Sequence, residues 1–147
     1  MSETAAFLAL IESASSRGVE ARRRFLGEHG EHEMGWSYAN IGEVDSRLNR
    51  QIGRKGFFRL FLYVPREGGG SVTHWMRITG LKTYSRPTVF NDPADGRRYL
   101  VHSRMVISSI ETLDPALRLE SFRSIDNRKP DPRHLELGFL FVVDPEV

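Results

Sequence analysis

The sequence of 147 residues contains no cysteine, and this absence removes several classes of function. A chain without thiols has no disulfide framework, no thiolate nucleophile and no zinc site built on cysteine. No run of about 18 apolar residues is present, so no membrane-spanning helix is expected. The N-terminus is acidic and lacks the pattern of a secretory signal peptide. We therefore expect one soluble, cytoplasmic domain over residues 1–147, and its end directly after an apolar strand suits a domain taken from a longer protein.

Lysine is scarce, and the basic residues are unevenly distributed. Of the 21 basic residues, 18 are arginine and 3 are lysine. Residues 1–46 carry a net charge of −4, residues 47–104 carry +9, and residues 105–147 carry −3. A genome rich in G and C would explain the excess of arginine but not its location. The basic middle segment therefore predicts a polyanionic partner, with nucleic acid as the favoured one.

Catalytic and phosphate-binding motifs are also missing. The sequence contains no Gly-x-Ser-x-Gly, no His-Glu-x-x-His and no phosphate-binding loop that ends in Gly-Lys-Ser/Thr. The cluster His29-Gly30-Glu31-His32-Glu33 has metal-ligand residue types, but an acidic solvated loop is the favoured interpretation. His74, His102 and His134 stand alone in the sequence. We expect no catalytic residue, no metal and no cofactor.

The periodicity of apolar residues changes along the chain, from a helical spacing to alternation. Helices are expected over residues 3–14 and 19–26, a loop over 27–35, and a further helix from Asp114-Pro115. Strands are expected over residues 57–64, 72–79, 99–110 and 135–143, with an irregular segment before the third. This order predicts an α+β domain, formed by a strongly bent antiparallel sheet or a small barrel with flanking helices.

Aromatic residues accompany the basic ones. Trp36 and Tyr38 fall in a polar, glycine-rich stretch, and Trp75 falls within a strand beside basic residues. Such rings can stack on bases while arginine binds phosphate. The alternative is that they fill the core. For Phe58 and Phe61 the core is favoured, whereas for Trp36 and Tyr38 the two interpretations stay open.

The order of these features resembles the PUA-like superfamily, in particular its EVE, YTH and ASCH branches. The resemblance covers residues 36–143 and includes Trp36, the strand with Trp75, the Asp114-Pro115 step and the closing strand around Phe139. The segment from Gly80 to Arg86 partly matches the ASCH motif but lacks its glutamate. The resemblance implies a barrel over residues 36–147, preceded by a helical extension over 1–35, with an aromatic pocket for one modified or flipped base.

The leading hypothesis is therefore a nucleic-acid-binding module that recognises a modified or flipped base. The expected base-binding residues are Trp36, Ser37, Tyr38, Asn40, Trp75 and Tyr84. The expected phosphate-binding residues are Arg54, Lys55, Arg59, Arg77, Lys82, Arg86, Arg97 and Arg98.

DNA is favoured over RNA as the partner. A motor or nuclease subunit of a modification-dependent restriction system is an expected associate. Two alternatives remain: an enzyme acting on nucleic acid or nucleotides through His74 or His102, and a protein-interaction module that uses the N-terminal helices.

Overall fold

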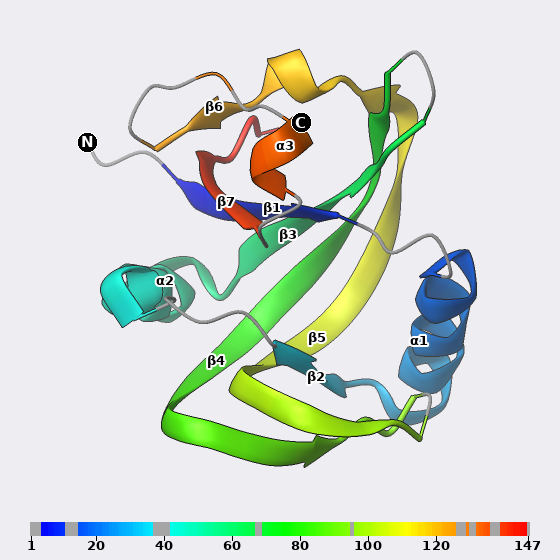
Figure 1. The fold of residues 1–147 in the computed structure, drawn as a ribbon, viewed down its shortest axis with the longest axis vertical. Coiled ribbons are helices and arrows are strands. Elements are labelled where there is room, and N and C mark those ends of the chain that lie inside the picture. Colours follow the sequence, from blue (N-terminus) through cyan, green and yellow to red (C-terminus); the bar gives the residue numbers. More distant parts are fainter. Residues whose placement is uncertain are drawn as a thin grey trace.

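Strands and helices alternate in the first part of the chain, and strands dominate the rest (Figure 1). The computed structural model describes residues 4–10, 15–36, 42–66, 69–94, 96–125, 129, 132–135 and 139–146. The elements are β1 (Ala5–Leu10), α1 (Ser15–His29), β2 (His32–Trp36), α2 (Gly42–Lys55), β3 (Phe58–Val64), β4 (Ser71–Asn91), β5 (Arg98–Leu117), η1 (Leu119–Ser121), β6 (Arg123–Ser124), α3 (Pro132–Leu135) and β7 (Phe139–Val143). The expected α+β class is confirmed.

Strand β1 lies inside the sheet, where a helix was expected. It pairs in parallel with β3 and antiparallel with β7. Its sequence AAFLAL is apolar at every position because both faces of the strand are buried. A short continuous apolar run of this kind has no period that separates a buried strand from a helix. The helix expected over residues 3–14 is therefore wrong for β1, and residues 1–35 are not a helical extension, because β1 and β2 both belong to the sheet.

The sheet is mixed, open and strongly curled. Within the described residues its strand order is β2-β5-β4-β3-β1-β7-β6, and no pairing joins the edge strands β2 and β6. A closed barrel is therefore not observed. Three strands separate β2 from β1, yet the ring of Trp36 on β2 stacks on that of Phe7 on β1, with centroids 5.8 Å apart and planes at 10°. This contact requires the sheet to curl until the two strands face each other.

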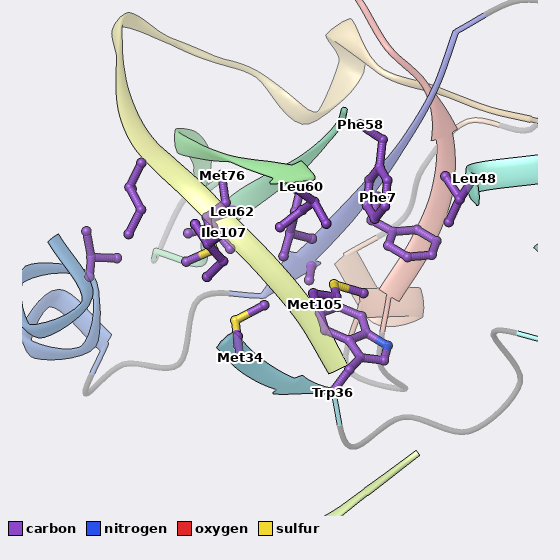
Figure 2. Close-up of a cluster of buried hydrophobic side chains, with 14 of the residues drawn as sticks. Phe7, Met34, Trp36, Leu48, Phe58, Leu60, Leu62, Met76, Met105 and Ile107 are labelled. Carbon is purple, nitrogen blue, oxygen red and sulfur yellow. The ribbon is translucent and has the colours of Figure 1, made fainter. Parts of the chain in front are cut away.

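Buried side chains form two clusters, one on each face of the sheet. The inner cluster fills the concave side, where α1 and α2 add apolar side chains (Figure 2). Its buried members are Ala5, Phe7, Ala9, Val19, Met34, Trp36, Leu48, Phe58, Leu60, Leu62, Met76, Ile78, Met105, Ile107 and Ile110. The outer cluster lies on the opposite face of β1, β3 and β7 and consists of Ala6, Leu8, Phe61, Tyr63, Val72, Leu119, Phe122, Leu135 and Val142. The core roles expected for Phe58 and Phe61 are confirmed.

Strands β4 and β5 form a long antiparallel ribbon that curves beneath β2 in Figure 1. The segment between residues 80 and 98, expected to be irregular, is mostly strand. Register shifts interrupt the pairing between Arg77 and Thr88, and such irregularities bend a ribbon and increase its twist. The strand also continues through Asp114 and Pro115, where a helix was expected. Proline favours an extended conformation for the residue before it, which suits a strand as well as a helix start.

Helix α2 was not expected from the sequence. Its apolar residues Val44, Leu48 and Ile52 recur at every fourth position and pack on the inner cluster. The buried side chain of Gln51 accepts a hydrogen bond from Ala5 N and donates one to Ala5 O, both at 2.9 Å. Gly56, with φ +90°, ends the helix. Two hydrogen bonds thus fix α2 to the start of β1.

Several other helices and strands are found near their expected positions, but they begin or end at different residues. Helix α1 contains the helix expected over residues 19–26, and β2 occupies part of the expected loop over 27–35. The strand expected over 57–64 is confirmed as β3. The strand expected over 135–143 is confirmed over residues 139–143 as β7, whereas Leu135 ends α3 and residues 136–138 lie outside the described residues. Within the described residues, no helix is both long and apolar enough to span a lipid bilayer.

Replacement of Phe7 by alanine is expected to lower the free energy of unfolding by about 3–5 kcal/mol, since the ring is fully buried and contacts Trp36, Phe58 and Phe141. Urea unfolding followed by tryptophan fluorescence measures this. Leu100→Ala is the control, because Leu100 is 59% exposed and its loss should cost less than about 0.5 kcal/mol. Equal effects of the two changes would contradict the assigned core.

Candidate nucleic-acid interface

The outer face of β4 is left uncovered where the outer cluster ends. Side chains alternate between the two faces of a strand. Met76, Ile78 and Leu81 pack on the inner cluster, so Trp75, Arg77 and Lys82 point to the outer face. Register shifts between Arg77 and Gly80 interrupt the alternation, so the inward-facing residues are even-numbered up to Ile78 and odd-numbered from Leu81. Two basic residues and one aromatic residue expected from the sequence therefore lie on one face.

Strand β5 continues this face. Met105 and Ile107 belong to the inner cluster, and Val101 and Ser103 are buried, so the residues between them point outward. Together the two strands present a surface that we call the outer strip. It consists of Phe57, Trp75, Arg77, Lys82, Tyr84, His102 and Arg104. Phe57, which precedes β3, is included because Arg77 lies over its ring.

Cations and aromatic rings are paired along the outer strip. The guanidinium carbon of Arg77 lies 4.2 Å from the centroid of the Phe57 ring. The Nζ atom of Lys82 and the guanidinium carbon of Arg104 each lie 5.6 Å from the centroid of Tyr84. Arg104 also forms a 3.0 Å ion pair with Glu33 of β2. Rings held beside cations in this way can stack on a base while the cations meet its phosphates.

A cleft of about 270 Å³ lies next to Trp75 and has mixed charge. Its lining residues are Thr4, Lys55, Phe57, Arg59, Trp75, Asp144 and Glu146. The structure therefore brings together Lys55, Arg59 and Trp75, three of the residues expected from the sequence. Lys55 is exposed and its Nζ contacts Thr4 Oγ1.

Arg59 is a structural residue in this cleft. Its guanidinium lies 4.8 Å from the ring centroid of Phe61 and 4.9 Å from that of Trp75. Arg59 Nε donates a 2.7 Å hydrogen bond to Asp144 Oδ2, and a second guanidinium nitrogen contacts Oδ1. Only 7% of Arg59 is exposed. A buried cation already paired with a carboxylate does not suit the expected contact with phosphate.

Trp36 does not share a site with Trp75. It is 5% exposed and stacks on Phe7 in the inner cluster (Figure 2). Trp75 instead points to the outer face and packs against the outer cluster. The core interpretation therefore holds for Trp36, because a ring enclosed in this way has no open face for a base. Ser37, Tyr38 and Asn40 lie outside the described residues.

The other expected phosphate-binding residues fall into two exposed groups. Arg54 and Lys55 end α2, while Arg86, Arg97 and Arg98 lie near the turn between β4 and β5. Sequence reasoning missed Arg104 and Phe57. The run His102-Ser103-Arg104 is polar throughout, so no alternation in the sequence singles out Arg104.

The two histidines expected as alternative catalytic residues, His74 and His102, are both half-buried on strands of the sheet. Burial, followed by the charge of Arg23, lowers the pKa of His74, and its Nδ1 lies 2.8 Å from Thr73 Oγ1. Among the described residues, no carboxylate forms a hydrogen bond with His74 that would support acid-base catalysis. His102 lies on the outer strip. The side chain of His134 lies outside the described residues.

The segment of residues 29–33, for which an acidic solvated loop was the favoured interpretation, instead places His32 in β2, buried beside a cation. His32 is 1% exposed, and its Nε2 accepts a hydrogen bond from Arg22. The guanidinium of Arg22 also binds both carboxylate oxygens of Asp92, at 3.3 and 2.9 Å. Among the residues that the structure describes, no three His, Asp or Glu side chains are placed to hold a metal ion.

Comparison with protein-family models, curated proteins and solved structures found no match to this chain. The case for function therefore depends on the geometry of the outer strip and on the sequence.

The stability of the protein is expected to fall in acid through Asp92. Burial opposes ionisation of this carboxyl, but hydrogen bonds from Arg22 and from Ala94 N, together with the charges of Arg22 and His32, lower its pKa below the usual value of 3.8. The stabilisation is therefore present above pH 3.8 and is lost as the pH falls through the lower folded-state pKa. Urea unfolding between pH 6 and pH 2 should show a constant difference between wild type and Asp92→Asn well above pH 3.8 and a shrinking difference below it. A difference independent of pH would contradict this role.

The ion pair between Arg59 and Asp144 gives a second test of the cleft. Asp144→Ala leaves a buried cation without its partner and is expected to lower the free energy of unfolding by about 3–5 kcal/mol. The double variant Arg59→Met with Asp144→Leu removes both charges and should recover much of this loss. Urea unfolding of the three proteins measures both effects. Additive losses in the double variant would show that the two residues do not act as a pair.

Proposed function

We propose that the protein binds nucleic acid on the outer strip and holds an unpaired or flipped base against Tyr84 or Trp75. One observation carries this proposal: an uncovered sheet face presents aromatic rings with cations 4.2–5.6 Å from their centroids, within the segment of net charge +9. Sheets that expose aromatic residues in this way are a common platform for single-stranded nucleic acid.

The energies involved are compatible with this role. Stacking of one base on an aromatic side chain contributes about 1–3 kcal/mol, and extrusion of a base from a duplex costs a few kcal/mol. Phosphate contacts from Arg77, Lys82 and Arg104 would add to the stacking. Two rings with neighbouring cations can therefore offset the cost of holding one base out of its stack.

Three finer parts of the proposal rest on the sequence resemblance. These are a PUA-like relationship, the choice of a modified base in DNA over RNA, and association with a motor or nuclease subunit of a restriction system. The curled sheet with flanking helices is compatible with the first of them. Since Trp36 lies in the core, base recognition is assigned to Trp75 and Tyr84.

Tyr84→Ala is expected to weaken binding of a fluorescein-labelled single-stranded oligonucleotide by about 5- to 150-fold, the equivalent of one lost stacking interaction. Fluorescence anisotropy titration at low salt measures the affinity. Tyr84→Phe is the matched control, since it keeps the ring and should stay within about twofold of wild type. Wild-type protein that binds neither DNA nor RNA at low salt would contradict the proposal.

Lys82→Ala is expected to change the salt dependence of binding. The logarithm of affinity should fall linearly with the logarithm of salt concentration, and loss of one phosphate contact on a single strand should flatten that slope by about 0.7. Arg118→Ala makes the same change of charge at an exposed residue outside the outer strip and should leave the slope unchanged. Equal salt-dependence slopes for Lys82→Ala and Arg118→Ala would show that Lys82 does not contact a phosphate.

A further inference from the structure

Two large apolar side chains are exposed on the ribbon of β4 and β5. Val89 is 47% exposed and Leu100 is 59% exposed, and no other large hydrophobic residue of the described chain is exposed to this degree. The two residues are direct partners across the strands, so their side chains lie side by side on one face. They form a single apolar patch near the turn, which we call the apolar tip, and among the described residues no side chain buries it.

This pair lies on the same face as the outer strip. Leu100, His102 and Arg104 alternate along β5 with the buried residues Val101 and Ser103. The opposite face of the ribbon is packed on β2, since a Cβ atom built on Gly35 would meet Val101 Cγ1 at 2.6 Å. The apolar pair therefore lies beside the outer strip, on the side toward the turn, and is not part of it.

The ribbon that carries the pair is held in place at its turn. Asp92 is buried, binds Arg22 of α1 and accepts a 3.2 Å hydrogen bond from the hydroxyl of Tyr99. Asp92 N also donates to Arg97 O at 2.7 Å and closes the turn. These contacts join the turn to α1, so that the ribbon presents Val89 and Leu100 from a fixed support.

The charges around the pair indicate its partner. Arg86, Arg97 and Arg98 are exposed on the same end of the ribbon, where Asp92 is buried and bound to Arg22. Glu31 and Glu33 line a cleft with Asn91 and Pro93, so the other described carboxylates near the turn come from the segment that follows α1 and not from the ribbon. A second copy of this chain would bring its own arginines against these. A polyanion with an apolar interior complements both the basic rim and the apolar tip.

We propose that Val89 and Leu100 form a wedge that inserts between adjacent base pairs of duplex DNA. This inference rests on the proposed function and adds duplex DNA as the partner of the ribbon. Proteins that bend DNA commonly insert apolar side chains between base steps, at a cost of a few kcal/mol for unstacking. A two-stranded ribbon is narrow enough to enter a groove of the duplex. The opened step would release a base toward Tyr84 on the same face.

Duplex DNA that contains 2-aminopurine tests the wedge, because this base becomes fluorescent when it is unstacked. The test variant is Val89→Thr with Leu100→Thr, which keeps strand-forming residues and removes the apolar tip. The matched control is Val89→Ile with Leu100→Met, which keeps the tip apolar. Both changes are on exposed side chains, and circular dichroism confirms that each variant is folded.

The wild type and the Ile/Met control are expected to raise 2-aminopurine fluorescence several-fold on saturating duplex, and the threonine variant to leave it near the value of free DNA. Affinity of the threonine variant for a single-stranded oligonucleotide should stay within about twofold of wild type. An unchanged fluorescence rise in the threonine variant would overturn the wedge while leaving the proposed function intact.

Two other outcomes identify a different occupant of the tip. A wild-type dimer in size-exclusion chromatography that the threonine variant loses would assign the pair to self-association and overturn the wedge. Binding to vesicles with anionic lipids that only the threonine variant loses would do the same in favour of a membrane surface. Failure of the wild type to bind any oligonucleotide would contradict the proposed function itself, and the wedge with it.

Discussion

The stacking of Trp36 on Phe7 is the contact on which the arrangement of the sheet depends. It joins β2, at one edge, to β1, which lies beyond three intervening strands. A flat sheet would hold these strands far apart, so the contact exists only in a curled sheet whose concave side is filled by the inner cluster (Figure 2). The curl decides which side of β4 and β5 becomes core. Their other side extends beyond the outer cluster and remains available to a partner.

Buried polar pairs fix the two ends of this uncovered face. At one end Asp144 binds Arg59, whose guanidinium lies against the rings of Phe61 and Trp75. At the other end Arg22 and Asp92 hold the turn of the ribbon against α1. Buried charges of this kind are costly to leave unpaired, and each pair therefore holds its segment in one position. Between them the outer strip presents its rings and cations on a rigid support, which reduces the entropy lost when a ligand binds.

The sequence allowed the α+β class, the strands around Phe61 and Phe141, and the basic, aromatic character of the middle segment to be predicted. Strand β1 was missed because a strand buried on both faces shows no alternation, and α2 because its apolar positions are few and its surroundings polar. Of the residues expected to bind nucleic acid, Trp75, Arg77, Lys82 and Tyr84 share one face, while Trp36 and Arg59 are buried. Burial of those two depends on contacts with Phe7 and Asp144, which are 29 and 85 residues away in the chain. No local pattern shows such contacts.

The central claim is that nucleic acid meets the outer strip. Photo-cross-linking of the wild-type protein to a single-stranded oligonucleotide with 5-bromouracil, followed by mass spectrometry of the linked peptides, locates the contact without any mutation. Cross-links at Tyr84 or Trp75 are the predicted result, since Tyr84 lies on the outer strip and Trp75 lies where the strip meets the outer cluster. Cross-links confined to α1 or to η1, with none on β4 or β5, would contradict the account.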